Sequence, residues 1–108
     1  MAEIQLEVEG PGAVSATEDL LSIPGLSGHW SPAVEDPQRE GILVTIATLV
    51  AITAGTLTIA EKIYGWYQNA RQAQPSPSIE KAMLIGRNGE RILLKNATIE
   101  QIRQILDA

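Results

Sequence analysis

The chain contains no cysteine and no phenylalanine, and aromatic residues make up only 4% of its 108 positions. Without cysteine there is no disulfide framework, no thiolate metal site and no cysteine nucleophile. With so few aromatic side chains, the core must be aliphatic and built from Ile, Leu, Val and Ala. The length fits one small domain over residues 1–108, and its margin of stability should be thin because small domains bury a limited share of their surface.

Basic residues are scarce in the first part of the chain. Residues 1–40 contain eight acids and one base, Arg39, for a net charge of −7, whereas residues 41–108 contain seven bases and five acids, for a net charge of +2. Because phosphate binding needs a concentrated basic face, we do not expect nucleic acid as a partner. The first ten residues also lack the basic and apolar regions of a secretory signal, so we expect a cytoplasmic protein.

Patterns of catalytic or metal-binding residues are missing as well. His29 is the only histidine, and a single histidine makes neither a multi-ligand metal site nor a catalytic triad. Glu7 and Glu9 fall on one side of an alternating segment, and exposure to solvent explains them more simply than a catalytic carboxylate pair. We therefore expect no catalytic residue, no metal and no cofactor, and hence a protein that is not an enzyme.

The N-terminal region predicts a strand, a short helix and a loop. Residues 3–9 alternate polar and apolar side chains, which is typical of a half-buried strand. A short helix follows Gly12, with Ser15 or Thr17 as its cap, and stops before Pro24. We interpret residues 24–40 as a loop in which only the stretch 28–34 is able to pair as a short strand.

The middle of the chain has no charged residue between Glu40 and Glu61. We interpret it as the first part of a long apolar helix over residues 41–71, which becomes amphipathic towards its end. Small residues recur four apart and would line one ridge of this helix, where another backbone approaches closely: Ala47, Ala51 and Gly55. The ridge predicts a helix contact between copies or with a partner, or close packing on the protein's own sheet.

The same uncharged segment approaches the ~20 apolar residues that cross a hydrocarbon core, so a membrane-inserting helix is the alternative interpretation. The residues that would anchor it at the membrane interface are Tyr64, Trp66, Tyr67, Lys62 and Arg71. Five threonines and four alanines between residues 42 and 60 dilute its hydrophobicity. The sequence leaves both alternatives open, a helix buried by protein and a membrane-associated one.

The C-terminal part predicts a compact hairpin and helix. Residues 72–78 contain two prolines and predict a linker before the hairpin and closing helix at residues 79–108. Asn88 and Gly89 accept the positive φ values of a type I′ turn between two apolar runs. Thr98 with Gln101 predicts a capping box at the start of the closing helix. The fold class is thus α+β, with the element order β-α-(β)-α-β-β-α.

Several of these features together resemble the effector-associated constant component family. They are the N-terminal strand, the Thr-Ala-Gly break at residues 53–55, the aromatic and then basic end of the central segment, and Gly86-Arg-Asn-Gly-Glu-Arg-Ile-Leu-Leu followed by Thr98-Ile-Glu-Gln-Ile. That family consists of small bacterial proteins found beside effector modules, such as caspase-like or trypsin-like proteases and signalling NTPases, in predicted immunity or programmed-death systems. No enzymatic activity is ascribed to it.

The resemblance implies an accessory interaction component whose protein partner is a protease-like or NTPase effector, and we also expect a homo-oligomer. The alternative function is a membrane-inserting or pore-forming small protein that an associated protease activates.

Overall fold

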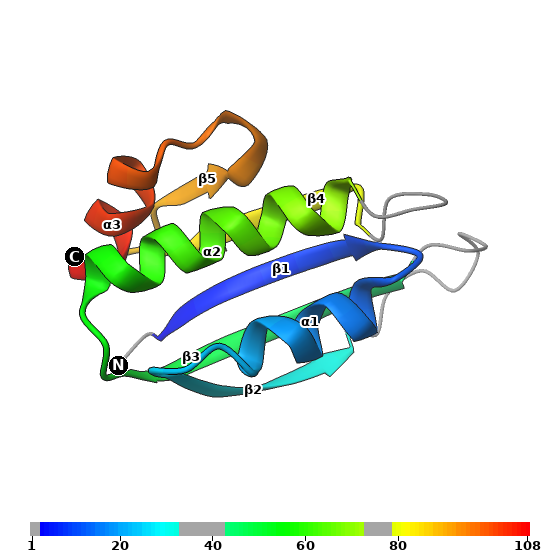
Figure 1. The fold of residues 1–108 in the computed structure, drawn as a ribbon, viewed down its shortest axis with the longest axis horizontal. Helices are drawn as coiled ribbons and strands as arrows, with labels where there is room; N and C mark the ends of the chain where they lie inside the picture. The colour runs from blue at the N-terminus through cyan, green and yellow to red at the C-terminus, as the bar shows by residue number, and fades with distance from the viewer. Residues whose placement is uncertain (1–2, 33–42, 73–78) are drawn as a thin grey trace.

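The computed structural model describes residues 3–32, 43–72 and 79–108. Five strands form one antiparallel sheet in the order β2-β3-β1-β4-β5. Figure 1 shows α1 and α2 covering one face of this sheet, with α3 beside α2 near β5. The elements, in chain order, are β1 (Ile4–Gly10), α1 (Ala13–Leu21), β2 (Leu26–Pro32), β3 (Leu43–Ile52), α2 (Thr56–Arg71), β4 (Lys81–Ile85), β5 (Arg91–Leu93), the 3-10 helix η1 (Leu94–Asn96) and α3 (Ile99–Asp107).

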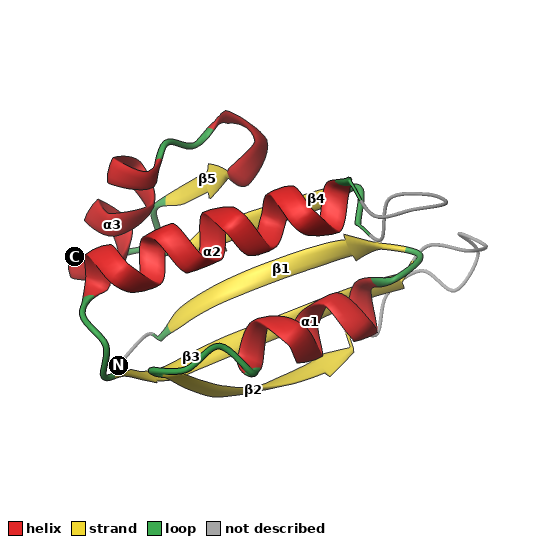
Figure 2. Cartoon of the chain, viewed as in Figure 1, coloured by secondary structure: helices red, strands yellow, loops and turns green. Residues whose placement is uncertain are grey.

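The predicted α+β class is confirmed, but the long apolar helix over residues 41–71 is wrong in its first half. Residues 43–52 form strand β3, and the helix occupies only residues 56–71 (Figure 2). The segment is rich in the β-branched residues Val, Ile and Thr, which favour strands. Gly55, with φ of +87°, lies at the N-cap of α2. No helix in the described ranges is long and apolar enough to cross a bilayer.

Strand β2 lies inside the segment that the sequence indicated as a loop over residues 24–40. It starts two residues before the stretch 28–34 that we expected to pair, and residues 33–40 lie outside the described residues. Ser27 pairs with Ala51 and Gly28 with Leu49, so Val50 has no partner on β2 and forms a bulge.

The bulge changes which side of the sheet the last residues of β3 face. Before it, Thr45, Ala47 and Leu49 are buried on the helix side. After it, Ile52 packs against the core, although strict alternation from Leu49 would place it on the opposite face. Val50 itself is 56% exposed.

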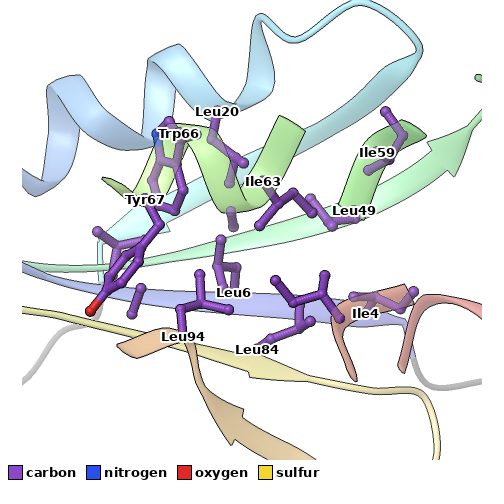
Figure 3. Close-up of a cluster of buried hydrophobic side chains, with 14 of the residues drawn as sticks. Ile4, Leu6, Leu20, Leu49, Ile59, Ile63, Trp66, Tyr67, Leu84 and Leu94 are labelled. Carbon is purple, nitrogen blue, oxygen red and sulfur yellow. The ribbon is translucent and has the colours of Figure 1, made fainter. Parts of the chain in front are cut away.

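The core lies between the sheet and the helices (Figure 3). Ile4, Leu6 and Val8 are buried as the alternation in β1 predicted. Two buried polar contacts join elements around the core, one between the two helices and one between a helix and the sheet. The indole N–H of Trp66 on α2 donates to the carbonyl oxygen of Ala16 on α1 at 2.7 Å. The hydroxyls of Thr17 on α1 and Thr45 on β3 form a buried hydrogen bond of 2.6 Å.

The buried position of Thr17 corrects a prediction about the start of α1. The helix begins at Ala13 with Gly12 as its N-cap and without a side-chain cap. Ser15 and Thr17 therefore lie inside the helix, and the expected cap at either residue is wrong. The helix does end before Pro24, as predicted.

The C-terminal hairpin is confirmed, with a different turn. Gly89 has φ of +86°, whereas Asn88 has no positive φ, so the turn is not type I′. The N–H of Gly89 donates to the carbonyl of Gly86 at 3.0 Å, and the N–H of Gly86 donates to the carbonyl of Glu90 at 2.7 Å. This pattern is a three-residue loop in which a turn is closed by a glycine at positive φ.

Helix α3 closes the chain as the sequence predicted. Thr98 and Gln101 form a complete capping box at its start. Arg87, from the hairpin loop, donates to the carbonyl oxygens of Leu106 and Ala108 at its end. The predicted linker at residues 72–78 lies outside the described residues except for Gln72, which ends α2.

Candidate functional site: the open face of the sheet

The three small residues predicted to form a helix ridge do not share a helix. Ala47 and Ala51 lie on β3, and Gly55 caps α2. Ala47 is fully buried and pairs with Leu6 and Trp30 of the neighbouring strands. Because two of these residues lie on a strand and the third lies at the start of a helix, they share no helix surface, and the predicted ridge is wrong.

The residues predicted as membrane-interface anchors all lie on α2, but they do not form one exposed belt. Trp66 and Tyr67 are buried in the core, and Tyr64 is half-buried. Lys62 and Arg71 are exposed, and the Arg71 guanidinium lies 5.7 Å from the centre of the Tyr67 ring. The two buried aromatic side chains therefore stabilise the domain instead of facing outwards.

No group of three or more His, Asp or Glu side chains in the described residues is placed to hold a metal ion. Displaced pKa values occur on the surface of α3. The hydrogen bond from Arg103 lowers the pKa of the Glu100 carboxyl, and the same contact raises the pKa of Arg103. This exposed pair spans one helical turn and supports α3 locally.

A groove of about 510 Å³ lies between α1 and α2. Its walls combine apolar side chains such as Ile23 and Trp66 with the polar side chains of Asp19, Lys62 and Asn69. Every buried side-chain nitrogen and oxygen in the described part of the chain has a hydrogen-bond partner. The groove therefore offers no buried unpaired polar atom to a small ligand, and its polar side chains, Asp19, Lys62 and Asn69, are exposed.

The candidate functional site is the face of the sheet that points away from α1 and α2. Along each strand the side chains of this face alternate with those of the core, so the strand registers define its members. We name it the open face. It consists of Gln5, Glu7 and Glu9 of β1; His29 and Ser31 of β2; Val44, Ile46, Thr48 and Val50 of β3; Lys81, Met83 and Ile85 of β4; and Arg91 and Leu93 of β5.

The central row of the open face runs across all five strands. Ile46 is paired with Ser31 on one side and with Glu7 on the other. Glu7 is then paired with Met83, and Met83 with Leu93. Directly paired side chains contact each other across strands. The Glu7 carboxylate therefore lies between two apolar side chains.

The neighbouring rows place the other charges of this face. Glu9 is paired with Val44 and with Lys81, so an opposite charge lies beside it on β4. Gln5 is paired with Thr48 and Ile85, and Arg91 follows at the β5 edge. Glu7 differs from Glu9, because within the described ranges no hydrogen bond or ion pair involves its side chain.

Part of this site was visible in the sequence. The alternation in β1 placed Glu7 and Glu9 on a solvated side, and the structure shows them half-exposed there. The apolar contribution of β3 was missed because both faces of that strand carry apolar residues, which hides the period of two. The number of β-branched residues in the segment was the signal that favoured a strand.

No family model, curated protein or solved structure matches this chain. Its resemblance to the effector-associated constant component family stays a prediction from sequence features.

Proposed function

We propose that the protein is a non-enzymatic interaction module that binds a protein partner on the open face of its sheet. The observation that carries this proposal is the apolar content of that face. Antiparallel sheets commonly keep one face polar and solvated. Here the face opposite the core carries Val44, Ile46, Val50, Met83, Ile85 and Leu93. These side chains form two apolar stripes, on β3 and on β4 and β5, on either side of the polar side chains of β1. Apolar groups gathered on one solvent-facing surface mark interaction sites.

The family resemblance indicates the biological context of this interaction. In that context the protein is an accessory component of a bacterial immunity or programmed-death system, and its partner is a protease-like or NTPase effector encoded beside it. Its role is to hold or place the effector through surface contact. The membrane-inserting alternative depended on one continuous apolar helix, and β3 occupies the first half of that segment.

The proposal is tested by co-purifying the chain with the product of the neighbouring effector gene. Ile46→Lys places a charge in the central row of the open face and should weaken binding about tenfold or more, which is the effect of losing a central apolar contact. Leu57→Lys is the matched control, because Leu57 is 51% exposed but lies on α2, on the helix side of the sheet.

Circular dichroism would confirm that both variants remain folded. If Leu57→Lys weakens binding as much as Ile46→Lys, or if Ile46→Lys binds like the wild type, the open face is not the binding surface.

A further inference from the structure

Glu7 lies at the centre of the open face, and its position restricts what is able to cover that face. Its paired neighbours are Ile46 and Met83, which are both apolar. A purely apolar partner would remove the carboxylate from water without supplying an opposite charge, which is strongly unfavourable. A cation compensates a carboxylate most strongly, so the surface that best fits this row places a Lys or Arg between apolar groups.

The spacing of the strands restricts the shape of that surface. β3 and β4 flank β1 on its two sides, so two strand spacings, about 9.6 Å, separate them. An α-helix with its side chains is about 10–12 Å across. One helix laid along β1 therefore contacts all three strands. Figure 1 shows α2 lying along the strands in this manner on the covered face.

A second copy of the chain fits this face poorly. In a symmetric dimer the two-fold axis passes through the middle of the shared surface, and each patch meets its own copy. With Glu7 at the middle of the open face, the two Glu7 carboxylates would approach each other. Such like-charge contacts disfavour a complex. The homo-oligomer expected from the sequence would need a different surface.

We infer, on the basis of the proposed function, that the partner presents an amphipathic α-helix to the open face, with a Lys or Arg against Glu7. The apolar side chains beside this cation contact β3 on one flank, at Val44 and Ile46, and β4 on the other, at Met83 and Ile85.

The experiment uses two synthetic helical peptides of about 18 residues, roughly 27 Å of helix. Both have leucines flanking one central position, which is lysine in the first peptide and uncharged norleucine in the second. Binding to the ¹⁵N-labelled protein is measured by NMR shifts and titration. The lysine peptide should bind about fivefold more tightly, as expected for a partly exposed ion pair, and should shift the amides of β1, β3 and β4.

Two variants separate this contact from general attraction between a cation and an acidic protein. Glu7→Gln should abolish the preference for lysine. Glu18→Gln removes the same charge from an exposed position on α1 and should keep that preference. An equal loss in both variants, or amide shifts away from β1, β3 and β4, would overturn the inference.

The remaining outcomes also separate the inference from the proposed function. If both peptides bind equally on the open face, the face is a docking surface but the cation on Glu7 is refuted. If neither peptide binds, the helical partner is refuted. In both cases the proposed function is tested separately. The test is whether the chain co-purifies with the neighbouring effector and whether Ile46→Lys weakens that binding.

Discussion

One methyl group added at two different glycines should change the stability of this domain in opposite directions. Gly28 does not have a positive φ, so an alanine there meets no conformational restriction. Its Cβ would, however, lie 2.1 Å from the carbonyl oxygen of Thr48 and 3.2 Å from the Cα of Leu49. Contacts below 3.0 Å are essentially never seen for a Cβ, so β2 and β3 must separate by about 0.9 Å at this point.

The separation occurs where the register of β2 against β3 shifts, so the hydrogen bonds beside Gly28 must lengthen. Overpacking of this kind costs about 1–3 kcal/mol, and a weakened hydrogen bond adds about 1 kcal/mol. We therefore expect Gly28→Ala to lower the free energy of unfolding by about 2–4 kcal/mol, which is a large share of the roughly 5–15 kcal/mol that holds a small domain together.

Gly65 is the matched position, since it lies inside α2 and a Cβ there would meet no atom within 4 Å. Glycine inside a helix costs about 0.5–1 kcal/mol relative to alanine. Gly65→Ala should raise the free energy of unfolding by that amount.

Urea denaturation followed by circular dichroism measures both changes. The free energy of unfolding of Gly28→Ala could instead stay within about 0.5 kcal/mol of the wild type, which is less than the overpacking cost expected here. That result would show that β2 does not approach β3 this closely. A loss of stability in Gly65→Ala would show that the helix is packed against other groups at that point.

Two further predictions concern the buried hydroxyl pair and the hairpin loop. Thr17→Val alone leaves the Thr45 hydroxyl without its partner and should cost about 1–3 kcal/mol, whereas the double variant Thr17→Val/Thr45→Val should be nearly neutral. A double-mutant cycle by urea denaturation checks this, and additive losses would show that the two hydroxyls do not interact. Gly89→Val should cost about 1–2 kcal/mol, because a β-branched residue resists φ of +86°. Thermal unfolding measures the effect, and an unchanged melting temperature would mean that the loop has another conformation.

Local sequence patterns were enough to predict the elements at the two ends of the chain. The alternation in residues 3–9 identified β1 and its buried side, because one face carries apolar residues and the other polar ones. Thr98 and Gln101 identified the start of α3, since their reciprocal hydrogen bonds involve only neighbouring residues. The hairpin was also predicted, although its turn type was decided by the conformation of Asn88.

The central segment shows why its secondary structure could not be predicted without the tertiary structure. Six of the ten residues of β3 are Val, Ile or Thr, which favour a strand, yet the segment has the length and apolar character of a long helix. Both neighbours of β3 in the sheet, β1 and β2, come from earlier in the chain. Pairing on both edges satisfies its backbone hydrogen bonds and selects the strand, and no pattern within the segment contains that information.

The open face is likewise a product of pairing between distant parts of the chain. The sequence alone determined that Glu7 points away from the core, because that follows from the alternation within β1. Only the sheet order and registers decided that Ile46 and Met83 lie beside it. A shift of one residue in either pairing would turn the side chains of that strand to the other face, so the apolar row around Glu7 exists only in the folded sheet.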